Sequence, residues 1–344
     1  MKQEQKKILR YSLWLIVLVI GAIYVVHTHS IKAPSSYHHN EGMIFGTFYH
    51  ITYQYTEDLH QGIRNEMKRV DNSLSPFNKQ SVITHINNND SVTLDSLFLK
   101  VFHRAQTISA ATDGAFDITV APLVNTWGFG FKSGKDLTAT QIDSLLQYVG
   151  YKKIHLTADN RIEKADPAMM LDCSAIAKGY ACDVVGDYLR RQGVKNFMVE
   201  IGGEVTLSGE RPNSGNWRIG VDKPIDDSLQ VKNELELILQ LSNCGMATSG
   251  NYRNFYYKNG KKYAHTIDPR TGYPVQHSVL SATVVAPDCL TADATATAFM
   301  VMGLEKAKEY ITKHPEIKAC LIYADGDSNN QLYISPTLKS AVVK

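Results

Sequence analysis

Apolar residues recur every three to four positions in several stretches before Gly193, a spacing that places them on one face of an α-helix. Helices are therefore predicted over residues 59–74, 94–108, 138–150 and 176–192. The last three lead into Asp113-Gly114, Gly150 and Gly193, and glycine readily takes the left-handed conformation that terminates helices. Helices thus come first along the predicted folded body.

Strand patterns dominate the rest of the chain, as short runs rich in β-branched and aromatic residues. These runs are FGTFYHITYQY near the start and then KKIHL, MMLDC, KNFMVEIG, EVTLSG, NWRIGV, LELILQLS, NFYYKNGKKYAHTI, VLSATVVA, ACLIYA and QLYIS. Lys258-Asn259-Gly260-Lys261 predicts a two-residue hairpin turn. Two more helices are predicted, one from about Thr291 and one over residues 304–313. Helices followed by consecutive strands predict an α+β fold with largely antiparallel or mixed sheets and packed helices, not a doubly wound parallel fold.

The N-terminus has the pattern of a membrane anchor. Four basic residues precede an uncharged apolar run that begins at Tyr11. We predict a cytoplasmic basic tail over residues 1–10, a transmembrane anchor or uncleaved signal over 11–27, a tether over 28–43 and one folded body over 44–344. Because basic flanks stay in the cytoplasm, the body is expected to face outward. A cleaved signal peptide has the same basic-then-apolar order and stays open as an alternative.

Charge and motif content argue against three classes of site. The chain carries 36 basic and 34 acidic side chains, and without residues 1–10 these become 32 and 33, so the body lacks the basic field that a nucleic acid would need. None of the five cysteines lies in a CxxC pair or a Cys/His metal spacing, so we interpret them as small buried residues. No GxGxxG motif follows the first strand and no Walker loop is present, so nucleotide sites of those types lack support.

Four polar clusters interrupt the predicted elements and are the candidates for chemistry. Residues 113–124 (DGAFDITVAPLV) are the first, and their plainer interpretation is a helix stop followed by a strand. The second cluster, residues 171–180, places Asp172 between a predicted strand and a helix. A helix N-terminus attracts phosphate, so Asp172 lies where a phosphate ligand would be expected. Capping of the helix by Asp172 is the alternative, and the sequence leaves both open.

The other two clusters carry acid–base and metal-binding groups. His265, Asp268 and Arg270 follow a predicted strand, where histidine suits a general base and arginine suits phosphate, although Asp-Pro turns are also common structural features. Asp293 and Thr297 lie four residues apart on one predicted helix face, and their oxygens are ligands that Mg²⁺ prefers. Alternatively, Asp293 stabilises the helix start and Thr297 bonds back to its own backbone.

Taken in order, several segments resemble the ApbE family of FAD:protein FMN transferases over about residues 44–335. The segments are GTFYHI, DGAFDITVAPLV, LDCSAIAKGYACD, EIGGEV, TSGNYRNF, HTIDPRTG and DATATAF. The resemblance implies an ApbE-like (T-fold-like) single catalytic body that uses Mg²⁺ as cofactor and FAD as substrate. It implies transfer of FMN to a threonine or serine hydroxyl of a target protein, with release of AMP. Expected partners are an acceptor flavoprotein, typically a subunit of a membrane redox complex, and the cytoplasmic (inner) membrane, with the body in the periplasm or exterior.

The same resemblance implies roles for individual residues. For the metal they are Ala175, Asp293, Ala296 and Thr297, and for FAD they are Phe45, Phe77, Ala115, Phe116, Asp117, Asp172, Lys178 and Ile267. Phe45 stands where the family usually has methionine, and phenylalanine can still pack on a ring system. His265 is expected to accept the proton of the attacking hydroxyl, with Asp268 as the alternative. The lipid-bearing cysteine of some members is missing, and the N-terminal helix is expected to replace it.

Two other functions stay open from the sequence. An FAD pyrophosphatase would use water in place of the protein hydroxyl and give FMN and AMP. A non-catalytic flavin-binding protein would need no metal, and the pair of Asp293 and Thr297 argues against it.

Overall fold

The computed structural model describes residues 36–128, 137–224, 234–251, 255–258, 261–264, 266–325 and 330–343, together with Glu4, Lys7 and Trp14. Its helices are α2 (His60–Leu74), α3 (Val82–Asn87), α4 (Ser96–Ala111), α5 (Ala121–Trp127), α6 (Ala139–Leu146), α7 (Ala177–Arg191), α8 (Cys289–Met302) and α9 (Leu304–Lys313). Two short 3₁₀ helices are η1 (Tyr151–Lys153) and η2 (Lys339–Ala341).

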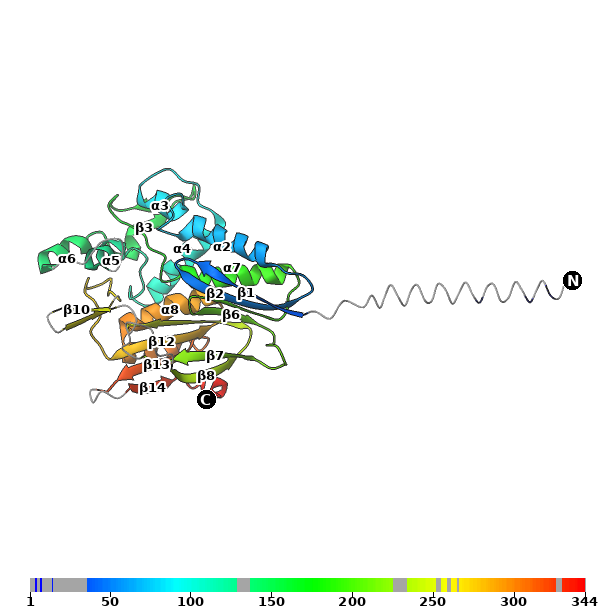
Figure 1. Ribbon diagram of the computed structural model, residues 1–344. Coiled ribbons are helices and arrows are strands. Elements are labelled where there is room, and N and C mark those ends of the chain that lie inside the picture. The colour runs from blue at the N-terminus through cyan, green and yellow to red at the C-terminus, as the bar shows by residue number, and fades with distance from the viewer. Residues whose placement is uncertain are drawn as a thin grey trace.

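The strands follow the same chain order (Figure 1). They are β1 (Ser36–Ile44), β2 (Thr47–Tyr55), β3 (Ile154–Leu156), β4 (Ile162–Lys164), β5 (Phe197–Ile201), β6 (Glu204–Ser208), β7 (Trp217–Asp222), β8 (Leu235–Leu241), β9 (Cys244–Gly250), β10 (Phe255–Lys258), β11 (Lys261–Ala264), β12 (Val279–Ala286), β13 (Lys318–Ala324) and β14 (Asn330–Ile334).

One eight-stranded sheet organises the molecule, in the order β1-β2-β5-β6-β9-β12-β13-β14. Neighbouring strands in it run antiparallel, as do the three two-stranded ribbons β3–β4, β7–β8 and β10–β11. The predicted α+β fold with largely antiparallel sheet is therefore confirmed.

The sheet has different partners on its two faces. On one face α7 packs against β5 and β6, and α8 packs against β9 and β12. On the other face the β7–β8 ribbon covers the sheet, and Trp217, Val221 and Leu237 of the ribbon share a core with Leu207 and Met246. Figure 1 shows α2, α4 and α7 on one side of the strands and β7–β8 on the other. A sheet covered on both faces buries apolar area on each of them.

Strands β6 and β9 are paired over only part of their length. Val205, Thr206 and Leu207 face Met246, Gly245 and Cys244. Beyond Met246, no strand among the described residues pairs with β9 on this side, whereas β12 continues along its other side to Gly250. The end of β9 therefore borders an opening next to the start of β6.

Most elements predicted from periodicity are present. Helices α2, α4, α6 and α7 match the four early predictions, and α8 and α9 match the two later ones. Thr138 forms a capping box with Gln141 at the start of α6. Gly114 and Gly193 take φ values of +71° and +89° just beyond α4 and α7, as expected for helix-terminating glycines.

Three predictions about secondary structure were wrong. Residues 36–43 are not a tether, because they form strand β1, whose register runs from Ser36 opposite Tyr55 to Ile44 opposite Thr47. MMLDC is not a strand, because both backbone groups of Leu171 bond to the Asn87 side chain. The strand expected after Gly114 is absent, and Ala121–Trp127 forms a helix with a proline in its first turn.

Strand β9 and helix α3 were not predicted, because the residues of both lack a recognisable pattern. Strand β9 has the sequence CGMATSG and lacks the bulky residues typical of strands. The reason is close packing, because a Cβ atom at Gly245 would collide with the backbone at the start of α8. Helix α3 has only six residues, too few for a periodic pattern.

The predicted membrane anchor, residues 11–27, lies outside the described residues except for Trp14. In the part of the chain that the structure describes, no helix has the length and apolar character needed to cross a membrane.

Candidate functional site

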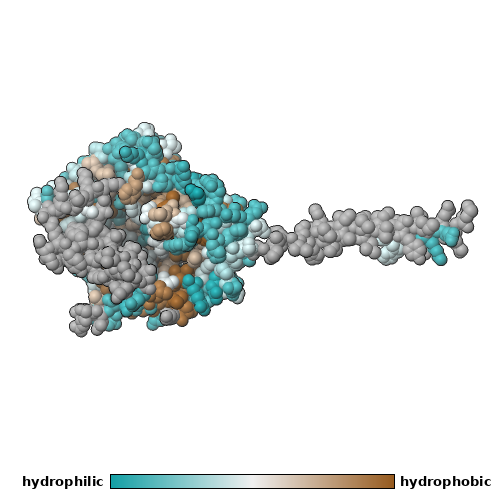
Figure 2. All heavy atoms as spheres, viewed as in Figure 1, coloured by the Kyte–Doolittle hydropathy of each residue, from teal (hydrophilic) through white to brown (hydrophobic). Residues whose placement is uncertain are grey.

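A cavity of about 550 Å³ lies where the opening beside β9 meets the helices. Its walls come from α7, α8, β6, β7, β9 and the loops before α5 and α7. The space-filling view shows hydrophobic atoms near a hollow in the middle of this face, with hydrophilic surface beside them (Figure 2). Ten of the predicted site residues line the cavity: Phe77, Ala115, Phe116, Asp117, Asp172, Ala175, Lys178, Ile267, Asp293 and Thr297.

Asp293 lies on α8 and reaches across to the start of α7. Its Oδ2 atom accepts the Gly179 N–H at 2.9 Å, one of the donors that the first turn of a helix leaves without an internal partner. Gly179 permits this close approach, because a Cβ atom there would lie 2.7 Å from Cβ of Asp293. Asp293 is only 2% exposed, and burial raises the pKa of its carboxyl, although the Lys178 ammonium opposes the shift. The ionised carboxylate would be stabilised by a cation in the cavity.

The start of α8 is held by other groups, so the alternative role considered for Asp293 does not apply. Asp288 accepts the Thr291 N–H, and Asp183 accepts the N–H groups of Cys289 and Leu290. Asp293 thus accepts a hydrogen bond from the start of α7 and does not cap α8.

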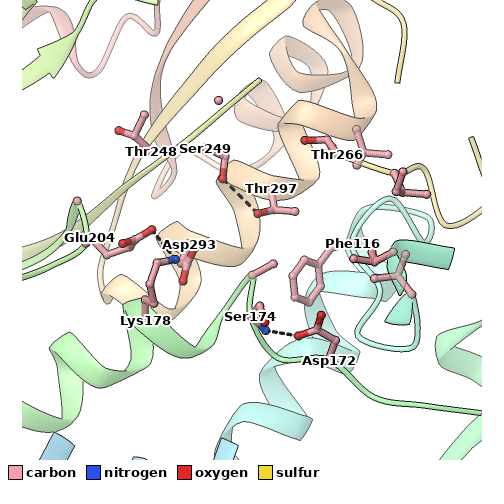
Figure 3. A pocket seen from close by; sticks show the side chains of 18 of the residues that line it. Phe116, Asp172, Ser174, Lys178, Glu204, Thr248, Ser249, Thr266, Asp293 and Thr297 are labelled. Atoms are coloured by element: carbon pink, nitrogen blue, oxygen red, sulfur yellow. Dashed lines mark hydrogen bonds and ion pairs between the residues drawn. The ribbon is translucent and has the colours of Figure 1, made fainter. Parts of the chain in front are cut away.

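Thr297 stands one turn further along α8 than Asp293. Its Oγ1 lies 3.2 Å from Oγ of Ser249 on β9, so the hydroxyl bonds to a neighbouring strand. Figure 3 shows this pair near Asp293 on one wall of the cavity. A carboxylate and two hydroxyl groups therefore meet where α8 packs on the end of β9.

Lys178 and Glu204 form an ion pair on the adjoining wall. Nζ of Lys178 lies 3.1 Å from Oε1 of Glu204, and the Glu204 side chain is only 5% exposed. Burial raises the pKa of Glu204, opposed by Lys178 and assisted by Asp293. Burial lowers the pKa of Lys178, but the two carboxylates outweigh it and raise the pKa overall. The ammonium therefore stays charged beside two acidic groups.

The loop before α5 supplies backbone to the cavity. Both carboxylate oxygens of Asp117 accept hydrogen bonds from the protein itself: Oδ1 from the N–H and O–H of Thr119, and Oδ2 from the Tyr151 N–H. The side chain is therefore not expected to contact a ligand. Burial raises the pKa of the Asp117 carboxyl against these donors. The carboxylate thus fixes the loop, and Ala115 and Phe116 line the cavity from it.

Asp172 and Ala175 belong to the turn that leads into α7. Oδ1 of Asp172 accepts the Ser174 N–H at 2.7 Å, and its own N–H bonds to the Ile118 carbonyl. Asp172 therefore caps a turn, not the helix proper, while it lines the cavity between the turn and Phe116 (Figure 3).

Two aromatic candidates are placed differently. Phe77 lines the cavity and is 72% exposed, so its ring is accessible at the cavity surface. Phe45 is not among the lining residues. It takes φ of +53° in the β1–β2 turn, followed by Gly46 at +73°, and packs partly against the core under the helices.

Two further predicted residues, Ala296 and Asp268, are not among the described residues that line the cavity. Ala296 is fully buried in the core between α8, α9 and the sheet. Asp268 is paired with Arg270, whose Nε and Nη2 atoms donate to its two oxygens at 2.8 Å each. This pairing favours a role in shaping the turn over proton transfer. His265 lies outside the described residues.

Sequence reasoning missed Glu204, Ser249, Thr248 and Thr266, which also line the cavity. Glu204 follows two glycines at the start of β6, within EIGGEV. A carboxylate at the first position of a strand after a glycine turn could have been flagged. The hydroxyls of β9 carry no such signal, because that strand has no recognisable pattern.

Comparison with known proteins places the chain in a family. The model of the ApbE family matches residues 45–321. The FAD:protein FMN transferase of Haemophilus influenzae is 37% identical over 289 residues, which cover 79% of this chain and 83% of that protein. The FAD:protein FMN transferase of Vibrio cholerae is 35% identical over 325 residues, covering 91% and 95%.

Solved structures agree with these relatives. The flavin transferase ApbE from Vibrio cholerae has a TM-score of 0.80 at 33% identity and covers 90% of this chain and 100% of its own. The apo form of the flavinyl transferase ApbE from Pseudomonas stutzeri has a TM-score of 0.79 at 29% identity and covers 89% and 97%. This chain therefore belongs to the ApbE family.

Proposed function

We propose that the chain transfers FMN from FAD to a hydroxyl group of another protein and releases AMP. The observation that carries the proposal is the cavity in which the buried Asp293 carboxylate, the Thr297 hydroxyl and the Lys178 ammonium converge. Relatives named FAD:protein FMN transferase over most of this chain support the same activity. In the reaction the acceptor oxygen forms a bond to the FMN phosphorus, and the bond from that phosphorus to the bridging oxygen of AMP breaks.

Mg²⁺ is the cofactor that fits the donor set. Its ligands would be the Asp293 carboxylate, the Thr297 hydroxyl and a backbone oxygen of Ala175, with water and substrate phosphate completing the shell. Among the described residues no three His, Cys, Asp or Glu side chains come together as a metal site, and Mg²⁺ commonly uses only one or two carboxylates. When bound, Mg²⁺ supplies positive charge next to the pyrophosphate oxygens.

The residues of the chain would bind and orient FAD, neutralise the charge on its phosphates and accept the proton of the attacking hydroxyl. Backbone groups of residues 115–117 and the side chains of Asp172 and Ile267 surround the space for the nucleotide, and the accessible Phe77 ring can stack on an aromatic ring. The Lys178 ammonium would neutralise phosphate oxygens as the bond to AMP breaks. His265 would accept the proton of the attacking hydroxyl, because Asp268 is paired with Arg270.

The setting of the reaction is also a proposal. Basic residues followed by the apolar run at residues 11–27 support anchoring in the cytoplasmic membrane with the catalytic body outside. The acceptor would then be a protein exposed on that side, such as a subunit of a membrane redox complex.

The decisive experiment incubates the protein with FAD, Mg²⁺ and candidate acceptor proteins, and weighs the products by mass spectrometry. An acceptor that gains the mass of an FMN phosphoester supports the proposal. AMP and free FMN with no modified protein would reassign the chain to FAD hydrolysis, and FAD left intact would reject catalysis.

Substitution of Asp293 tests the site within the same experiment. Asp293→Asn keeps an oxygen for the Gly179 N–H but removes the charge, so transfer should fall by about 10²-fold or more. Asp288→Asn is the matched control on the same helix, because asparagine caps helices as well as aspartate. Equal transfer by both variants would reject Asp293 as a cation ligand.

A further inference from the structure

Glu204 is the one member of the charged cluster to which the proposed reaction gives no role. It opens β6, while Lys178 comes from α7 and Asp293 from α8. Figure 3 shows the Lys178 nitrogen directed toward the two carboxylates, with Glu204 and Asp293 on the same wall. Two buried carboxylates therefore share one ammonium.

The second carboxylate oxygen of Glu204 destabilises the fold. Oε1 pairs with Lys178 at 3.1 Å, but Oε2 is buried and has no hydrogen-bond partner among the described residues. A buried carboxylate oxygen without a donor destabilises a fold, and a glutamine would carry no charge to desolvate. Structure alone therefore gives no reason for a charged group at this position.

Charge balance supplies a reason. Among the residues that the structure describes, Lys178 supplies the ammonium that pairs with Glu204, and it interacts electrostatically with both Glu204 and Asp293. Without the Glu204 charge, the Lys178 ammonium would be attracted to Asp293 alone. A cation approaching Asp293 would then have to compete with the ammonium for the same carboxylate.

We propose that Glu204 is a positioning residue that holds the Lys178 ammonium away from Asp293, so that Asp293 stays available to a divalent cation. The inference rests on the proposed cation site at Asp293. Lys178 held in this way also faces the cavity, where the substrate phosphates are expected. Glu204 thereby sets the cation affinity of the site without touching the cation.

Mn²⁺ binding to the full-length protein tests the inference without any turnover. Free Mn²⁺ is measured by electron paramagnetic resonance at pH 8 for the unsubstituted protein, Glu204→Gln, Lys178→Met and the double variant. Glu204→Gln should raise the Kd for Mn²⁺ about tenfold or more, because the freed ammonium pairs with Asp293. Lys178→Met, which removes the competitor, should bind at least as tightly as the unsubstituted protein.

The double variant separates positioning from other roles. Removing both charges should restore the Kd to within about threefold of the unsubstituted protein, because no ammonium is left to compete. If Glu204 bound the cation directly or only supported the fold, the double variant would stay as weak as Glu204→Gln. Asp222→Asn, which removes another carboxylate that lines the cavity, is the matched control and should change the Kd by less than about threefold.

Each failure has its own signature. Unchanged Mn²⁺ binding by Glu204→Gln, or a double variant without recovery, overturns the inference and leaves the cation site intact. Absence of Mn²⁺ binding by the unsubstituted protein overturns the cation site and the inference together. If Glu204→Gln does not fold, weaker binding by Lys178→Met than by the unsubstituted protein still overturns the competition on which the inference depends.

Discussion

Asp183 joins helix α7 to the start of α8 and to strand β6 through three hydrogen bonds. Its oxygens accept the N–H groups of Cys289 and Leu290 and the hydroxyl of Thr206. Burial nevertheless raises the pKa of its carboxyl to about 6, because the three donors do not fully replace the lost hydration. The residue is buried between α7, β6 and the start of α8, and its protonation state affects the stability of the fold.

This pKa predicts a pH-dependent contribution to stability. The folded chain binds the Asp183 proton more tightly than the unfolded chain, so the contribution is fully present below about pH 4 and is lost as the pH rises through about 6. The free energy of unfolding of the protein, minus that of Asp183→Asn, should therefore decrease by roughly 2 kcal/mol from pH 4 to pH 6.5. Urea unfolding of both proteins across this range measures the difference.

Asp288→Asn serves as the control for this experiment. It also removes a carboxylate at the start of α8, but from a side chain that is 35% exposed, so an equal change with pH in both differences would not come from the burial of Asp183. A difference for Asp183→Asn that stays constant or grows with pH would mean that Asp183 is already ionised at pH 4.

At the residue scale, sequence reasoning identified acidic groups but could not rank them by burial. Asp268 and Asp293 both lie within polar clusters, yet Asp268 is paired with Arg270 and Asp293 lies at the cavity. The difference arises from tertiary contacts, because the hydrogen-bond partner of Asp293 and the ion-pair partner of Glu204 both come from α7, which is distant from them in the sequence. No local spacing encodes such contacts.

At the scale of elements, periodicity identified the long helices and most strands because their bulky apolar residues repeat. Strand β9 was not predicted, because its neighbours leave room only for small residues. The close contact of Gly245 with the start of α8 is an example. Strand β1 was not predicted because its residues are mostly polar and lack an alternating apolar pattern, and its pairing with β2 makes it a strand.

Deletion of β1 tests whether this polar strand belongs to the fold. A chain that starts at Phe45 loses all nine β1 positions paired with β2, the contact of Asn40 with Asp58, and the packing of Tyr37 on the core under β7–β8. It also exposes β2 as a new sheet edge. It should unfold at a lower urea concentration than a chain that starts at Ser36, and it should aggregate more readily.

The comparison discriminates between strand and tether. A chain that starts at Ser36 keeps every described element and should match the full-length protein in its midpoint of unfolding. Equal midpoints for the chains starting at Ser36 and Phe45 would show that β1 contributes nothing to stability.

At the scale of the whole molecule, the proposed anchor makes a prediction about location. Removal of residues 1–35 deletes the basic and apolar segments and leaves the described body unchanged. The full-length protein should sediment with membranes after a high-salt wash, and the shortened one should not, because hydrophobic insertion is insensitive to salt. Full-length protein found in the soluble fraction would reject the anchor, and cleavage near residue 28 would indicate a signal peptide instead.

The order of strands in the sheet has a consequence for how the chain acquires its fold. Strand β2 pairs with β5, although helices α2 to α7 intervene between them in the sequence. The complete sheet cannot form from local contacts alone, so more than half of the chain must be synthesised before β2 and β5 can pair, and folding should be slow. Such a delay suits a protein that is proposed to pass through a membrane, because a chain that folds late stays extended long enough to be exported.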